Sequence, residues 1–223
     1  MSSQNKTVVY VYRKSSFDDK PLRYSLRSLK NLPHRNVVII GDCPLWATEV
    51  SHIRVTKEYK SPTDDVRHKL SLTDHPDITD DFILMNDDFY ILQPQNDVTV
   101  YHKGTLAESL AVRNPKSGWY YKTLLATTKK YPNGLDYSHH SPFVYNKHKL
   151  HTLLDAQNAL LWRSAYGNEY SIKSELREDC KVFSVKELQD TDLLSSSPKI
   201  ERAAFFWWWL GKRFKKKSLY ERS

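Results

Sequence analysis

Short apolar runs alternate with amphipathic segments through the first ninety residues of the chain. Four runs are rich in aliphatic, β-branched and aromatic side chains, which is typical of buried strands, and they predict strands at residues 7–12, 37–40, 52–55 and 81–85. Leucines at helical spacing predict a helix over 22–32. A second helix, capped by Thr63 or Asp64, is expected to run through Leu72. This alternation predicts an α/β fold with a mostly parallel central sheet flanked by helices.

The second half of the chain is less regular. Apolar residues at helical spacing predict one long helix over 148–166, which Gly167 is expected to end. A late strand at 181–185 and a C-terminal helix over 199–214 follow. Because no internal repeat and no long low-complexity linker interrupts the sequence, we expect residues 1–223 to form a single domain.

An acidic pair follows the fourth predicted strand. In the segment FILMNDDFYIL, residues 82–92, Asp87 and Asp88 interrupt an otherwise apolar run. Ionised carboxylates in apolar surroundings need a cation or hydrogen-bond donors. At the carboxyl end of a parallel strand they would face the crevice where open α/β sheets bind ligands, and their oxygen atoms suit Mg²⁺ or Mn²⁺. Asn-Asp-Asp is also common turn composition, but the apolar flanks favour a metal site.

The glycine and cysteine content argues against several classes of protein. The chain has six glycines and contains neither the G-x-G-x-x-G fingerprint nor a P-loop, which disfavours kinases, P-loop ATPases and standard nicotinamide dehydrogenases. Two cysteines are too few for a disulfide scaffold or a four-cysteine zinc site. The first residues form no apolar signal segment, and the longest strongly apolar run, 203–210, is far shorter than the roughly 20 residues of a membrane span. We therefore expect an intracellular protein with no stable membrane span.

The net charge of +8 is concentrated near the C-terminus, where residues 201–223 carry seven basic and two acidic side chains. Such a cluster attracts polyanions, or it only keeps the protein soluble. The candidate polyanion-binding or acceptor-binding residues in this segment are Trp208, Lys212, Arg213, Lys215, Lys216 and Lys217. The five consecutive aromatics at 205–209 allow three interpretations: a helix packed in the core, an anchor in a membrane interface, or a surface on which nucleic-acid bases stack.

The motif Asn86-Asp87-Asp88 after a hydrophobic strand resembles the D-x-D region of GT-A glycosyltransferases. The segments that extend the resemblance over most of the chain are residues 8–42, HKGTL at 102–106, SHHSPFVYNK at 138–147, RSAYGN at 163–168 and SLYE at 218–221. In this order they resemble small glycosyltransferase-like proteins of phages and some bacteria, including proteins proposed to modify DNA bases, and distantly the Stealth-type capsule sugar-phosphate transferases. The resemblance implies a single GT-A-like domain and a cytoplasmic enzyme, in the bacterial host cell if a phage encodes it.

The resemblance also implies roles for individual residues. Asp88, the last carboxylate of the motif, would ligate Mn²⁺ or Mg²⁺. His140, in the segment H-S-P-F, would be a further metal ligand, with His139 as the neighbouring alternative. Asp87 would face the ribose or the sugar of a nucleotide-sugar donor, most simply a UDP-sugar, and so take part in catalysis.

Other polar residues are candidates for the donor site and for catalysis. Arg13 follows the first predicted strand and would pair with a diphosphate or stack on a base, whereas Asp42 ends the second strand and would accept hydrogen bonds from base or ribose. Arg163 belongs to a segment that the resemblance places where the site closes, and Lys181 is a candidate for neutralising the leaving diphosphate. Asp136 is the candidate general base of an inverting transfer; a retaining mechanism would need no base there.

The sequence leaves three hypotheses for the acceptor. The first is a hydroxylated or hydroxymethylated base in phage DNA, which would have to be flipped out of a duplex to react. The second is a cell-surface polysaccharide or lipid-linked glycan, with the C-terminal segment lying on a membrane surface. The third comes from another class of protein: a non-catalytic nucleic-acid-binding module in which the acidic pair is only a turn.

Overall fold

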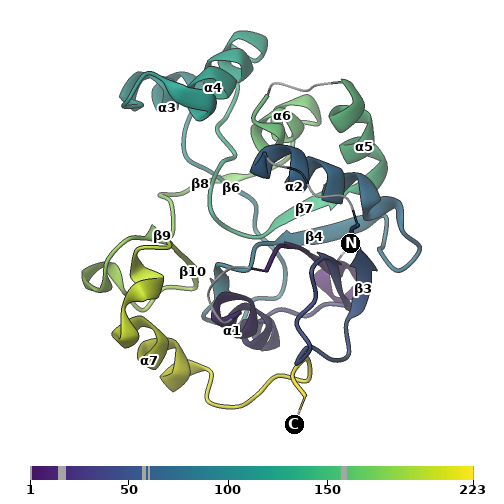
Figure 1. The fold of residues 1–223 in the computed structure, drawn as a ribbon. Coiled ribbons are helices and arrows are strands. Elements are labelled where there is room, and N and C mark those ends of the chain that lie inside the picture. Colours follow the sequence, from purple (N-terminus) through teal and green to yellow (C-terminus); the bar gives the residue numbers. More distant parts are fainter. Residues whose placement is uncertain (1, 15–18, 57–58, 60, 157–159, 223) are drawn as a thin grey trace. The chain divides into compact units, whose positions relative to one another are not determined.

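The computed structural model describes residues 2–14, 19–56, 59, 61–156 and 160–222 (Figure 1). These residues group into two compact units. The first unit comprises Met1–Val98, His140–Lys147 and Cys180–Ser223, and the second comprises Thr99–His139 and His148–Asp179. The chain therefore leaves the first unit and returns to it twice, and the expectation of a single domain stays a prediction.

A five-stranded sheet forms the centre of the first unit, in the order β3-β2-β1-β4-β7. Its strands are β1 (Thr7–Tyr12), β2 (Val37–Gly41), β3 (Ser51–Arg54), β4 (Asp81–Met85) and β7 (Phe143–Asn146). Neighbouring strands pair in parallel from β3 to β4, and β7 runs antiparallel to β4. Strands β1, β2 and β4 are almost wholly buried, which is why continuous apolar runs marked them in the sequence. The predicted α/β architecture with a mostly parallel sheet is confirmed, and β7 is a strand that the sequence analysis missed.

Two helices connect the parallel strands and flank the sheet (Figure 1). They are α1 (Lys20–Ser28) and α2 (Pro62–Ser71). The leucine face of α1 is buried, as the helical spacing predicted. Ser61 caps α2, with its Oγ accepting a hydrogen bond from the backbone N–H of Asp64. The predicted caps, Thr63 and Asp64 itself, are wrong because Pro62 occupies the start of the helix, where its fixed backbone and missing N–H are tolerated.

A smaller sheet and one helix complete the first unit. The sheet has the order β5-β10-β9, and the elements are β5 (Phe89–Ile91), β9 (Lys181–Val182), β10 (Leu193–Ser196) and α7 (Ala204–Arg213). The predicted strand over 181–185 is therefore only two residues long. The predicted helix over 199–214 is broken at Ala203, whose extended backbone separates a short turn from α7.

The second unit is mainly helical. It contains α3 (Leu106–Val112), α4 (Gly118–Lys130), most of α5 (Lys147–Ala156), α6 (Trp162–Glu169) and the paired short strands β6 (Tyr101–His102) and β8 (Glu175–Leu176). The single helix predicted over 148–166 is wrong, and its residues 157–159 lie outside the described ones. Leu161 has an extended backbone ahead of α6, because its side chain is buried and its N–H donates to Oγ1 of Thr127 at 2.9 Å.

Gly167 does not end a helix but lies inside α6. A Cβ atom at this position would lie 2.4 Å from the ring of Tyr137. The glycine therefore allows close packing of helix against ring, and its role is steric.

Among the described residues, short 3₁₀ turns lie before β1 and between other elements, at Ser3–Asn5, Leu29–Asn31, Leu72–Asp74, Val185–Glu187 and Ile200–Arg202. Within the described part of the chain, no helix is both long enough and apolar enough to cross a membrane.

Candidate active site

The carboxyl ends of the parallel strands bring three polar segments to one edge of the sheet. Tyr12 pairs with Gly41 and Tyr10 pairs with Met85, so β1 and β2 end at the same level and β4 ends two residues earlier at the same edge. Arg13, Asp42 and the Asn86-Asp87-Asp88 motif follow these strands directly. Strand order reverses at β1, with β2 on one side and β4 on the other, which is the position where open α/β sheets bind ligands.

The end of β2 depends on a glycine. Gly41 has a φ of +118°, and a Cβ there would lie 2.1 Å from the carbonyl oxygen of Tyr12. The next residue, Asp42, donates its backbone N–H to the same oxygen at 3.1 Å. Its carboxylate accepts a hydrogen bond of 2.6 Å from the backbone N–H of Lys14. The glycine thus lets two chain segments approach closely and holds Asp42 at the edge.

A pocket of about 470 Å³ opens at the ends of β1, β2 and β3. Arg13 and Asp42, both predicted as donor-binding residues, line it. Lys69 lines it too; this lysine is almost fully buried, pairs with Asp65 at 2.7 Å and donates to the Tyr12 carbonyl at 3.1 Å. From the sequence, Lys69 was expected on a solvated helix face, with a phosphate contact as the alternative, and its burial shows the solvated face to be wrong. Asp65 was missed, although the i, i+4 spacing of the two residues on a helix is a signal for such a pair.

The Asn86-Asp87-Asp88 motif forms a turn between β4 and β5, yet both aspartates are only half exposed. The motif therefore adopts the turn that its composition allowed, and the metal site stays a prediction. Oδ2 of Asp88 accepts a hydrogen bond from Oγ of Ser195 at 3.1 Å and lies 3.3 Å from Nζ of Lys181. The structure thus brings together two predicted site residues, Asp88 and Lys181.

A third carboxylate, Glu201, contributes negative charge to this group. Burial, followed by the charges of Asp88 and Glu201, raises the pKa of Asp87 to about 7. Burial also raises the pKa of Glu201, whose Oε1 accepts a hydrogen bond of 2.6 Å from Ser196. Glu201 was missed because it lies in a separate turn more than a hundred residues after the motif. The charges of Asp87, Asp88 and Glu201 thus act on one another at this end of β4, and Lys181 offsets part of them.

Tyr12, the last residue of β1, feels the charge of one carboxylate from the acidic motif and of one from the pocket. Its pKa is raised first by burial, then by the hydrogen bond to Asp19, and also by the negative charges of Asp87 and Asp42. Both carboxylates therefore act on the same phenol at the end of β1. The acidic motif and the pocket belong to one edge of one sheet.

The ring of His140 contacts the residue that follows the acidic motif. This residue is Phe89, which the ring meets edge to face with the centroids 6.5 Å apart. The backbone carbonyl of His140 accepts a hydrogen bond from the thiol of Cys180.

The neighbouring His139 belongs to the second unit; it is fully buried and its Nε2 is 2.9 Å from the carbonyl oxygen of Glu178. Burial lowers the pKa of His139 to about 4, so the ring is neutral at pH 7.

Two other predicted residues, Asp136 and Arg163, also lie in the second unit. The Asp136 carboxylate is fully buried and accepts hydrogen bonds from Ser109 at 2.6 Å, from the Ser138 N–H at 2.9 Å and from Ser164 at 3.1 Å. This is the environment of a structural carboxylate. Arg163 is half-buried on α6 and contributes a positive charge that helps to lower the pKa of His139.

The aromatic stretch of α7 divides between core and surface. Phe206 is fully buried in an apolar cluster with β5 and β10, whereas Phe205 and Trp208 are 51% and 56% exposed. Lys212 lies over the ring of Trp208 at 5.4 Å, and Arg213 lies 4.3 Å from the ring of Trp209. The core interpretation therefore holds for one face of the helix and not for the other.

Comparison of the chain with models of known protein families finds no match, and comparison with curated proteins finds none either.

Proposed function

We propose that the protein is a metal-dependent glycosyltransferase of GT-A type that moves a sugar from a nucleotide-sugar donor to an acceptor hydroxyl. One observation carries the proposal: the half-buried Asp87 and Asp88 lie at the carboxyl end of β4, beside the strand-order reversal and on the same sheet edge as a pocket. This is where an α/β sheet places a ligand. The resemblance of the motif to the D-x-D region gives the reaction class.

The residues around the motif suit a divalent cation. Asp88 and Asp87 supply carboxylate oxygens, which Mn²⁺ or Mg²⁺ accepts, and His140 is the further ligand that the resemblance implies. Burial first, and then the charges of Asp88 and Glu201, raises the pKa of Asp87, and a bound cation would favour its ionised form. When bound, such a metal stabilises the negative charge that develops on a departing diphosphate.

The pocket at the ends of β1 to β3 suits the nucleotide part of the donor, with a UDP-sugar as the first choice. Its volume of about 470 Å³ falls in the range of small-molecule sites. Arg13 would bind a phosphate or stack on the base, and Asp42 would accept hydrogen bonds from ribose or base. Lys181, now 3.3 Å from Asp88, would offset the charge of the diphosphate. Asp136 has no step in this scheme, because its carboxylate is buried and hydrogen-bonded.

The acceptor we propose is a hydroxylated or hydroxymethylated base in DNA. The basic C-terminal segment supports this choice, since seven of its side chains are Lys or Arg and only two are acidic.

Two measurements test the proposed function. Mn²⁺ binding is followed by titration, and release of nucleoside diphosphate from UDP-sugars is followed with Mn²⁺, with EDTA, and with DNA that carries 5-hydroxymethyl pyrimidines. Asp88→Asn should abolish both signals because it removes a ligand charge. The matched control is Asp80→Asn, at the opposite end of β4, whose side chain is 72% exposed. Full turnover in EDTA, or in Asp88→Asn, would refute the proposal.

A further inference from the structure

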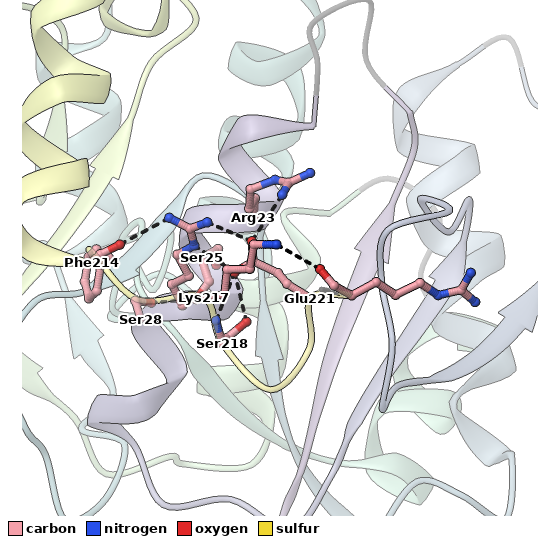
Figure 2. A network of polar contacts seen from close by, with 9 residues as sticks. Arg23, Ser25, Ser28, Phe214, Lys217, Ser218 and Glu221 are labelled. Carbon is pink, nitrogen blue, oxygen red and sulfur yellow. Dashed lines mark hydrogen bonds and ion pairs between the residues drawn. The ribbon is translucent and has the colours of Figure 1, made fainter.

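The basic C-terminal segment is held in place on the first unit (Figure 2). The Glu221 carboxylate is fully buried and accepts hydrogen bonds from Arg27 at 2.7 and 2.8 Å and from Arg23 at 3.2 Å. Its Oε1 also accepts the backbone N–H of Ser218 at 3.0 Å. Further upstream, Arg27 donates to the carbonyl of Phe214 at 3.2 Å. The stretch between residues 214 and 218 is therefore fixed at both ends.

This anchoring forms a second pocket, of about 590 Å³, between α1 and the C-terminal segment. Thirteen residues line it; seven of them are Lys or Arg, and none is Asp or Glu. Two of the seven are already paired, Arg27 with Glu221 and Arg213 with Asp190 at 3.1 Å. Lys215 and Lys216 are exposed and, among the described residues, neither has an ion-pair partner shown. The hollow is therefore lined by more cations than these two acidic partners compensate, which favours a ligand that carries several negative charges.

Exposed aromatic rings continue this pocket along α7. Lys212 lines the pocket and also lies over the ring of Trp208. Trp208 in turn packs against Phe205, with ring centroids 5.2 Å apart. The three residues follow one another at helical spacing, so the cationic pocket and the aromatic face form one surface. Proteins that bind single strands combine two components, namely cations that bind the phosphates and aromatic rings that stack on the bases.

We propose that this surface binds single-stranded nucleic acid, with phosphates in the pocket and bases stacked on Trp208 and Phe205. The concave form of the pocket favours a strand over a lipid bilayer, because a flat array of headgroups does not enter a hollow whereas a chain of phosphates does. The inference rests on the proposed function in one respect, namely that the bound strand would be the acceptor of the sugar. Binding of the strand itself needs neither the metal nor the nucleotide-sugar donor.

The test measures binding of a labelled oligothymidylate of about 12 nucleotides by fluorescence anisotropy in EDTA without donor, which separates it from the proposed transfer reaction. Replacing Lys215, Lys216 and Lys217 by Gln should weaken binding about 100-fold at about 0.1 M salt, because each lost phosphate contact removes about 0.7 from the salt slope. Trp208→Ala should weaken it about tenfold. Circular dichroism verifies that each variant is folded.

Matched controls come from the second unit. Replacing the exposed Lys116, Lys122 and Lys129 by Gln removes the same charge, and Trp119→Ala removes a ring that is 53% exposed. Both control variants should bind as the unchanged protein does. Equal losses in test and control variants would overturn the proposal in favour of unspecific charge attraction. Binding to phosphatidylserine vesicles without binding to the oligonucleotide would overturn it in favour of a membrane surface.

Discussion

Nζ of Lys181 lies 3.3 Å from Oδ2 of Asp88, although the two residues are 93 positions apart in the chain. The lysine comes from β9 and the aspartate from the turn after β4. The charge of Lys181 also acts on Glu201, whose carboxylate in turn affects Asp87. In the absence of a bound metal this lysine offsets part of the mutual repulsion of the three carboxylates.

Lys181→Met should therefore change cation binding as well as stability. We expect Mn²⁺ affinity to rise about fivefold, because the lysine competes for Asp88, and the free energy of unfolding of the metal-free protein to fall by about 1 kcal/mol. Isothermal titration and urea unfolding measure the two effects. Lys147→Met is the control, since Lys147 pairs with Asp80 at 3.3 Å at the other end of β4. Unchanged Mn²⁺ affinity would show that Lys181 and the metal do not share Asp88.

Glu221→Gln should destabilise the first unit in a pH-dependent way. Burial acts to raise the pKa of Glu221, but hydrogen bonds from Arg27 and Ser218 outweigh it and hold the pKa below its ordinary value. A lowered carboxyl pKa contributes stability above the unfolded-state pKa, and this stability is lost as pH falls through the folded-state pKa. We expect a loss of about 3 kcal/mol at pH 7, because two arginines lose their partner, and a smaller loss in acid. Urea unfolding at pH 7 and at pH 4 measures the loss in free energy of unfolding. Equal losses at the two pH values would contradict the claim that the ionised Glu221 carboxylate stabilises the fold.

Asp136→Asn should reduce the free energy of unfolding and should affect the turnover of the donor much less. Burial acts to raise the pKa of Asp136, but the charge of Lys103 and the hydrogen bonds from Ser109 and Ser138 hold it below its ordinary value. The amide NH₂ of Asn would face hydrogen-bond donors, so we expect a loss of about 2 kcal/mol at pH 7 that shrinks as pH falls below the carboxyl range. Thermal unfolding and donor turnover are compared. Normal stability with turnover abolished would establish Asp136 as the general base instead.

Gly41→Ala should distort the edge where Asp42 and the pocket lie. The new Cβ would meet the Tyr12 carbonyl at 2.1 Å and would also force alanine into a backbone with φ of +118°. Gly118→Ala is a suitable control, because Gly118 has φ of +82° with no atom within 4 Å of the added Cβ. We expect about 1 kcal/mol of destabilisation for Gly118→Ala and at least about 3 kcal/mol for Gly41→Ala. Similar losses in the two variants would show that the close approach to Tyr12 is relaxed at little cost.

Local pattern predicted the elements whose burial is continuous. Strands β1, β2 and β4 appear in the sequence as unbroken apolar runs because both faces of a central parallel strand are covered. Strand β7 alternates between buried and half-buried residues and is only four residues long, so it gives a weak signal. Helices α3 and α4 escaped prediction for a related reason: few of their residues are buried, and the apolar stripe is narrow.

The sequence by itself determined the α/β character of the central sheet and placed Asp87 and Asp88 directly after a buried strand, because both follow from neighbouring residues. Only the tertiary structure decided that Lys181 pairs with Asp88, that the charge of Glu201 acts on Asp87, and that Lys69 is buried at the wall of the pocket. The physical reason is that the burial of a charged side chain and its choice of partner depend on packing between segments far apart in the chain. The local pattern of apolar and polar residues therefore carries no information about such contacts.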